Sequence, residues 1–145
     1  MEYNLMNAEE KDYDFLIMVH HTTLKSHVKK IWGWDEAFQN KMYQDRFDPT
    51  HCKIILMQGE QIGYLETYEQ DQVIHLSNLL ILPQYQGHGL GTSIIKDIQA
   101  KAKMKQKKVR LAVFKINHQA KNLYERLGFH ISDDSETHFY MDFTH

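Results

Sequence analysis

The stretch from residue 73 to residue 114 restricts the fold more than any other part of the sequence. Residues 73–82 are rich in branched apolar side chains and stop at Pro83, as is typical of a buried strand. A glycine-rich loop leads into residues 90–104, a segment whose apolar residues fall on one face of a helix. These residues are Leu90, Ile94, Ile98 and Ala102. Because residues 109–114 then read as a strand of alternating apolar character, the pattern predicts a strand-helix-strand crossover within a sheet.

The rest of the chain predicts further strands and helices on both sides of this crossover. The predicted strands cover residues 3–7, 53–57, 61–68, 73–82, 109–114, 129–131 and 138–143, and the predicted helices cover 9–28, 35–47, 90–104 and 117–127. The order β-α-α-β-β-β-α-β-α-β-β predicts an α/β fold, in the form of an α+β mixed sheet flanked by helices.

Length and composition limit the class of protein. A chain of 145 residues with 42% apolar residues predicts a single domain over residues 1–145. A formal net charge of -2 gives no reason to expect a nucleic-acid partner. A single cysteine, Cys52, and the lack of a signal peptide or an apolar run of about 20 residues predict a cytoplasmic protein without a membrane partner. The ten histidines lack the spacing of metal ligands, so we expect no metal.

The loop Gln86-Gly87-His88-Gly89-Leu90-Gly91 is the clearest candidate for a binding site. Glycines at every second position let the backbone turn tightly, and the helix that follows adds the positive end of its dipole. The loop is therefore suited to a pyrophosphate, although a tight turn without a ligand would have the same sequence. A triphosphate loop would need Gly-Lys-Ser/Thr where this chain has Gly91-Thr92-Ser93, and a dinucleotide loop would need G-x-G-x-x-G rather than G-x-G-x-G.

A wider stretch around the loop resembles a known family. The residues 81–91, Ile-Leu-Pro-Gln-Tyr-Gln-Gly-His-Gly-Leu-Gly, are similar to the Q/R-x-x-G-x-G/A signature of the GCN5-related N-acetyltransferases (GNATs). Downstream, Asn117-x-x-Ala120-x-x-Leu123-Tyr124-x-x-x-Gly128-Phe129 resembles the second conserved block of that family. The order of predicted elements agrees over nearly the whole chain, which implies the GNAT fold.

The resemblance implies that acetyl-CoA is the co-substrate and assigns the residues that would bind it. The backbone of Leu80, Ile81 and Leu82 would pair with the pantetheine arm. The amides of residues 86–92 would hold the pyrophosphate, with Gln86 in place of the more common arginine. These loop residues are Gln86, Gly87, His88, Gly89, Leu90, Gly91 and Thr92. The side chain of Asn117 would bind the pantetheine amides, although it would also suit a helix N-cap.

The same resemblance implies transfer of an acetyl group to a primary amine by direct attack, without a covalent enzyme intermediate. Tyr124 would act as the general acid that protonates the departing thiolate, and the backbone N–H of Ile81 would polarise the thioester carbonyl. Glu66 and His75 are the candidates for a general base, on strands expected to border the acceptor site. Each would also suit a solvated strand, and water chains often replace a dedicated base in this family. Cys52 is not expected to be a nucleophile.

The acceptor amine is less constrained by the sequence. Trp32 and Trp34 stand beside two carboxylates and would suit either a pocket for a cation or the cover of a sheet edge. Asn78 and His138 are further candidates for the acceptor site. A small molecule, a polyamine and a protein amine all remain open as acceptors, and the resemblance allows a homodimer. The alternative function is a non-catalytic sensor of acyl-CoA, which would have no need of Tyr124.

Overall fold

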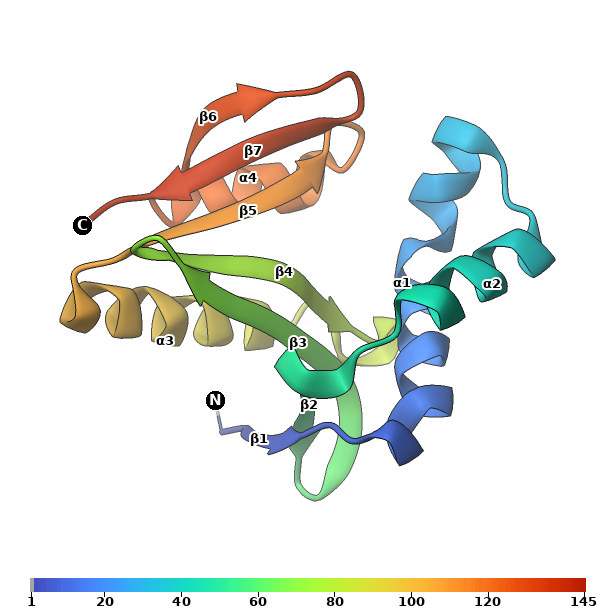
Figure 1. The fold of residues 1–145 in the computed structure, drawn as a ribbon. Coiled ribbons are helices and arrows are strands. Elements are labelled where there is room, and N and C mark those ends of the chain that lie inside the picture. Colours follow the sequence, from blue (N-terminus) through green and yellow to red (C-terminus); the bar gives the residue numbers. More distant parts are fainter. Residues whose placement is uncertain (1) are drawn as a thin grey trace. The chain divides into compact units, whose positions relative to one another are not determined.

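The computed structural model describes residues 2–145, and its elements follow the predicted order (Figure 1). The strands are β1 (Asn4–Asn7), β2 (Cys52–Met57), β3 (Glu60–Gln70), β4 (Val73–Ile81), β5 (Lys108–Phe114), β6 (His130–Asp134) and β7 (His138–Phe143). The α-helices are α1 (Tyr13–Trp32), α2 (Glu36–Arg46), α3 (Leu90–Lys105) and α4 (His118–Arg126). Short 3-10 turns precede α1, β2 and α3 at Glu10–Asp12, Pro49–His51 and Pro83–Tyr85.

The seven strands form one mixed sheet in the order β1-β2-β3-β4-β5-β7-β6. The pairs β1–β2, β2–β3, β5–β7 and β6–β7 are antiparallel, whereas β4 and β5 are parallel. Since α3 lies between β4 and β5 in the chain, the predicted strand-helix-strand crossover is confirmed. The predicted mixed α/β fold with helices flanking the sheet is confirmed as well.

Two elements, α1 and β6, differ from their predicted bounds by at least three residues at one end, and each has a local reason. The first helix was expected over residues 9–28, but α1 begins at Tyr13 after a 3-10 turn in which the Asp12 carboxylate accepts from the Glu9 amide at 2.8 Å. It continues to Trp32, because the first residue with a positive φ is Gly33 at 82°. The sixth strand was expected over residues 129–131 and runs to Asp134. All of its residues are exposed, so pairing with β7 rather than an apolar pattern determines its length.

The chain divides into two compact units, and each is described by itself. Unit 2 comprises residues 2–66 and 78–86, and unit 1 comprises residues 67–77 and 87–145. The prediction of a single domain over residues 1–145 stays a prediction.

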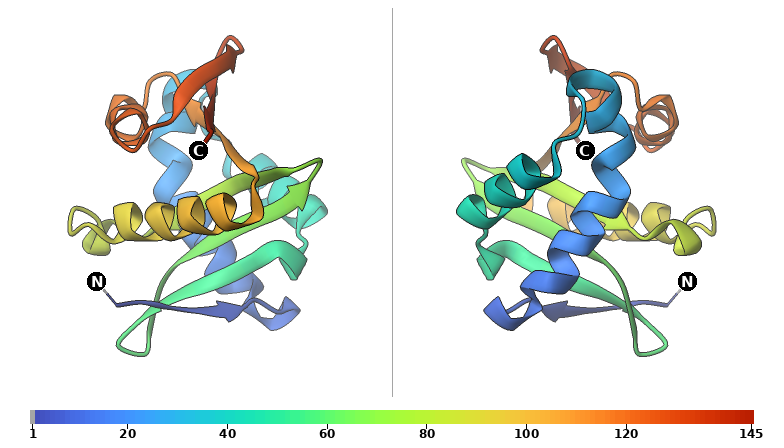
Figure 2. Two further views of the ribbon diagram at one scale, coloured as in Figure 1. Left: turned by 90° about the vertical axis from the view of Figure 1, so that its left-hand side faces the viewer. Right: turned by 90° about the vertical axis from the view of Figure 1, so that its right-hand side faces the viewer.

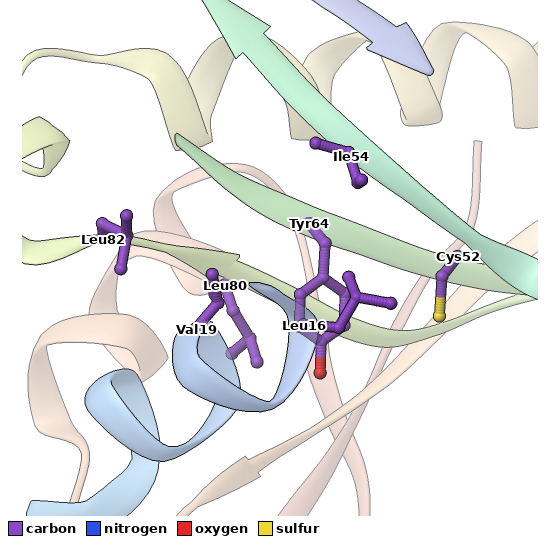
Figure 3. Packing of buried hydrophobic residues seen from close by; sticks show 7 residues of the cluster. All are labelled: Leu16, Val19, Cys52, Ile54, Tyr64, Leu80 and Leu82. Atoms are coloured by element: carbon purple, nitrogen blue, oxygen red, sulfur yellow. The ribbon is translucent and has the colours of Figure 1, made fainter. Parts of the chain in front are cut away.

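In unit 2, α1 packs on one face of the strands (Figure 2). The buried cluster at this contact combines residues of α1 with residues from β2, β3 and the end of β4 (Figure 3). Its members are Leu16, Val19, Cys52, Ile54, Tyr64, Leu80 and Leu82. Leu16 and Val19 lie one helical turn apart and are both fully buried, as expected for the apolar face of a helix.

Unit 1 contains two ion-pair groups that tie its strands and helices together. The Arg110 guanidinium donates to both carboxylate oxygens of buried Asp142, at 2.8 and 3.0 Å, across the β5–β7 pair. Burial alone would raise the pKa of Asp142, but the hydrogen bonds and charge of Arg110 lower it overall. The Glu69 carboxylate is bound by the ammonium groups of Lys101, Lys105 and Lys107, and hydrogen bonds from Lys107 and Lys105 hold its pKa at about 2.

Within residues 2–145, no helix has the length and apolar character required to cross a bilayer. Over the same residues, no group of three or more histidine, cysteine or acidic side chains is placed to hold a metal ion.

Candidate active site

The glycine loop leads into α3 with a backbone that only glycine adopts easily. Gly87 and Gly89 have φ values of 81° and 85°, and Gly89 caps the helix in the left-handed region. A Cβ added at either position would meet nothing within 4 Å, so the positive φ rather than crowding requires glycine. The first turn of α3 contains no acidic residue. The N-terminus of this 16-residue helix therefore fits an anion such as a pyrophosphate.

Gln86 braces the start of this loop within unit 2. Its side-chain amide donates to the carbonyl oxygen of Ile81 at 2.7 Å, and its backbone N–H donates to Pro83 at 3.2 Å. Both kinds of donor on Gln86 are thus already used inside the chain. The amides from Gly87 to Thr92 remain the candidates for binding a pyrophosphate, and Gln86 positions them.

The last two residues of β4 and the residue that follows it are the three expected to bind the pantetheine arm. Leu80, Ile81 and Leu82 are all buried, and the Leu82 amide donates to Ile62 at 2.9 Å. Gly63 on β3 approaches this segment so closely that an added Cβ would lie 2.1 Å from the carbonyl oxygen of Leu80. Among the residues described, the register of β4 with β5 covers only Val73–Leu76. The strand continues to Ile81, five residues beyond that pairing.

Asn117 occupies the N-cap of α4, as one of its two predicted roles requires. Its Oδ1 accepts from the Ala120 amide at 3.2 Å, which satisfies one of the free donors of the first turn. The cap uses only the oxygen, so the Nδ2 group is left to donate to a ligand.

Tyr124 lies two turns along α4 from Asn117 and is half-buried. Its ring packs at a centroid distance of 5.7 Å from Phe129. Burial raises the pKa of Tyr124 to about 12, so the hydroxyl keeps its proton at neutral pH. No hydrogen-bond partner for this hydroxyl is found in residues 2–145, which leaves the proton to a ligand.

Unit 2 contains a cavity of about 240 Å³ beneath α1 and α2, referred to below as the unit 2 cavity. It is lined by His20, Gln39, Met42, Tyr43, Arg46, Phe47, Asp48, Cys52, Tyr64, Glu66 and Asn78. Two of the predicted site residues meet here, because Asn78 Nδ2 donates to Glu66 Oε1 at 2.9 Å. This bond links neighbouring strands β3 and β4 and fixes the orientation of the Glu66 carboxylate.

Most of the other polar groups around Glu66 are neutral at physiological pH. Burial and the nearby Glu66 charge raise the pKa of the Cys52 thiol to about 12, which agrees with the expectation that Cys52 is no nucleophile. Burial also raises the pKa of Tyr43 to about 12 and that of its hydrogen-bonded neighbour Tyr64. Burial, with a smaller contribution from the adjacent His21, lowers the pKa of His20 to about 4.

Four other predicted residues do not line this cavity. His75 stacks on Tyr68 at 4.5 Å between centroids, and His138 packs on Phe114 at 4.4 Å, both in unit 1. Trp32 is 62% exposed. Trp34 makes an edge contact with the His21 ring at 5.0 Å. The ammonium group of Lys25 lies over the Trp34 ring, 5.5 Å from the ring centroid. The indole N–H of Trp34 donates to the Glu36 carboxylate.

Several residues that line the cavity could not be identified from the sequence. Arg46, Met42 and Gln39 follow one another on α2 at intervals of three or four residues, which places them on one face of the helix. That periodicity was readable, but nothing in it indicated that this face turns toward Glu66. Tyr64 lies two residues before Glu66 on β3, so the two side chains share one face of the sheet.

Comparison with known proteins identifies the family. The model of the acetyltransferase (GNAT) family matches residues 15–129, and the chain therefore belongs to this family. The family expected from the two motifs is confirmed.

Individual relatives agree with this assignment. A thialysine N-epsilon-acetyltransferase from Mus musculus is 41% identical over 64 residues, which span 43% of this chain and 38% of the mouse protein. A PaiA N-acetyltransferase from Thermoplasma acidophilum, solved in complex with coenzyme A, has a TM-score of 0.81 at 17% identity, with 100% of each chain covered. A GNAT family acetyltransferase from Elizabethkingia anophelis, solved with acetyl-CoA bound, has a TM-score of 0.65 at 16% identity, with 99% of this chain and 97% of that chain covered. The two structures establish likeness of fold.

Proposed function

We propose that this protein is an N-acetyltransferase that uses acetyl-CoA to acetylate a primary amine by direct attack. The observation that carries the proposal is the glycine loop, which presents an acid-free helix N-terminus to an anion. Support for the donor comes from the two structural relatives solved with coenzyme A and acetyl-CoA. Support for a nitrogen acceptor comes from the name of the mouse relative, an N-epsilon-acetyltransferase.

The residues that would hold the donor contribute backbone amides of the glycine loop, the backbone of residues 80–82 and one side-chain amide. The amides from Gly87 to Thr92 would bind the pyrophosphate, with Gln86 bracing the loop against Ile81. The backbone of Leu80–Leu82 would bind the pantetheine arm. Asn117 would donate to the same arm through Nδ2, because its Oδ1 already caps α4.

In the transfer itself, acetyl-CoA supplies the acyl group as a thioester. The amine nitrogen forms a bond to the carbonyl carbon while the carbon–sulfur bond breaks, and the Ile81 N–H stabilises the charge on the carbonyl oxygen. Tyr124 donates its proton to the departing thiolate. The proton lost by the amine balances the proton gained by the thiol, so no other co-reactant is needed.

Glu66 is the candidate that would accept the proton of the amine, directly or through water. It lines the unit 2 cavity, and Asn78 holds only one of its two oxygens by a direct hydrogen bond. His75 is less suited to this role, because its ring is stacked on Tyr68 and does not line the cavity.

Two measurements test the proposal in sequence. Coenzyme A should raise the melting temperature of the protein, whereas NAD should not. Thiol release from acetyl-CoA should then depend on an added amine. Binding of coenzyme A without thiol release from any amine would instead support the alternative, a sensor of acyl-CoA.

A further inference from the structure

The unit 2 cavity contains opposite charges that are not paired within the chain. Glu66 lies on β3, and Arg46 lies in the last turn of α2. No ion pair joins them, and none is found for either side chain in the part of the chain that the structure describes. Both charges line the same cavity, so a ligand bound there can pair with both.

The Glu66 end of the cavity lies beside the strand expected to bind the donor. Asn78, which orients Glu66, precedes Leu80 by two residues on β4, and alternate residues of a strand share a face. Nearby Cys52 and Tyr43 are uncharged at neutral pH, so they do not neutralise Glu66. A ligand ammonium is therefore the natural partner of Glu66 at this end.

The rim presents a different pair of charges. Arg46 and Asp48 are both exposed and lie two residues apart, one cationic and one anionic. One oxygen of Asp48, Oδ1, accepts from the amide and hydroxyl of Thr50, at 3.0 and 2.6 Å. The second carboxylate oxygen of Asp48 and the Arg46 guanidinium have no hydrogen bond or ion pair within residues 2–145, and together they suit a ligand that carries both signs of charge.

The space between the two ends is small and partly apolar. Its volume of about 240 Å³ lies just below the usual range of about 300–1,000 Å³ for small-molecule pockets. Met42 and Phe47 contribute apolar surface to the wall, which suits a short aliphatic chain.

From these three features we infer that the acceptor is a free diamino acid with an aliphatic side chain. Its side-chain amine contacts Glu66, its α-carboxylate contacts Arg46, and its α-ammonium contacts Asp48. This inference rests on the proposed function and specifies its substrate class. A simple diamine would place a second cation against Arg46, and a lysine within a protein has no free carboxylate to offer. Arg46 is thus the residue that selects an amino acid over a diamine.

The test compares matched pairs of acceptors that differ only in the carboxylate. Thiol release from acetyl-CoA is measured with lysine against cadaverine and with ornithine against putrescine. For at least one pair, we expect kcat/KM for the amino acid to exceed that for the diamine by about tenfold or more, as one charged hydrogen-bonded contact would give.

Variants of Arg46 separate recognition from folding. Arg46→Gln should lower kcat/KM for the amino acid by about 10- to 100-fold, mainly through KM, and leave the diamine unchanged or improved. Arg46→Lys should restore part of the loss, because it keeps the charge but not the planar fork. Lys41→Gln is the control, since Lys41 is exposed on the same helix and does not line the cavity.

The outcomes distinguish this inference from the proposed function. Turnover of diamines in preference to both amino acids, or an equal loss for both classes in Arg46→Gln, would overturn the diamino-acid inference and leave the acetyltransferase standing. No thiol release with any amine, although coenzyme A still stabilises the protein, would overturn both.

Discussion

Replacing Tyr124 with phenylalanine removes the one oxygen atom to which the proposed function assigns proton transfer. In the structure this hydroxyl has no hydrogen-bond partner within residues 2–145, and the ring packs near Phe129. Phenylalanine keeps the ring and leaves no protein group unsatisfied. We therefore expect the free energy of unfolding of Tyr124→Phe to lie within about 0.5 kcal/mol of the wild-type value.

The effect of Tyr124→Phe on turnover should be much larger. With a pKa of about 12, Tyr124 is protonated at neutral pH and can donate to the thiolate as it forms. A hydrogen bond to a charged group contributes about 1.5–3 kcal/mol, which corresponds to a loss of about 10- to 150-fold in kcat. Binding of coenzyme A should change little, because the interaction with the thiolate develops only in the transition state.

The pH dependence of kcat gives a second, independent test of the role of Tyr124. A group with a pKa of about 12 does not titrate between about pH 6 and pH 10, so it cannot produce an alkaline decline in that range. The wild-type and Tyr124→Phe profiles should therefore have the same shape there and differ by a constant factor.

The assay combines thiol release at saturating substrates, urea unfolding, and stabilisation by coenzyme A. Tyr140→Phe serves as the control, because Tyr140 is another half-buried tyrosine of unit 1 with no assigned role. Wild-type kcat in Tyr124→Phe would refute the reasoning. A lower kcat accompanied by the loss of several kcal/mol of stability or of coenzyme A binding would also refute it, since Tyr124 would then be structural.

Three further predictions concern stability. Gly63→Ala should lower the free energy of unfolding in urea by about 3 kcal/mol, because the added Cβ would overlap the carbonyl oxygen of Leu80. Gly59→Ala, with open space but a φ of 81°, should lower it by about 1 kcal/mol. Equal losses would contradict the close approach of Gly63 to Leu80. Arg110→Met should cost about 1.5–3 kcal/mol, because the buried Asp142 carboxylate loses two charged hydrogen bonds and keeps only Lys108 at 3.5 Å. Combining Arg110→Met with Asp142→Leu should recover most of that loss. Hydrogen bonds from lysines lower the pKa of Glu69 from 4.5 to about 2, so the contribution of Glu69 to stability is present above pH 4.5 and lost as the pH falls toward 2. Glu69→Gln should flatten the dependence of the unfolding free energy on pH in this range, and an unchanged slope would contradict the prediction.

The sequence predicted the fold well because its strongest local signals agree with its tertiary structure. Of the four residues predicted for the apolar face of α3, Leu90, Ile94 and Ala102 are buried and Ile98 is half-buried. The β4–α3–β5 crossover follows from that pattern and from the glycine loop. The sequence was a poorer guide to β6, since an exposed edge strand owes its extent to hydrogen bonds with its neighbour.

The residues of the candidate site could be named from the sequence more readily than their contacts. The residues of the glycine loop, with Asn117 and Tyr124, fall in the two motifs that resemble the GNAT family and could be named in advance. The pairing of Glu66 with Asn78 depends on strand register, and the contribution of Arg46 depends on which face of α2 turns inward. The segment around Trp32 and Trp34, with its two neighbouring carboxylates, suggested a pocket for a cation. The composition of a segment does not determine where its side chains point.

Because its only cysteine is buried, the folded protein should react very slowly with thiol reagents. Cys52 is 6% exposed, and a thiol with a pKa of about 12 contains almost no reactive thiolate at neutral pH. A disulfide reagent that counts released coenzyme A should therefore give no background signal from native enzyme. Unfolding exposes one thiol per chain, so the same reagent, added before acetyl-CoA, detects the unfolding of a variant separately from its activity.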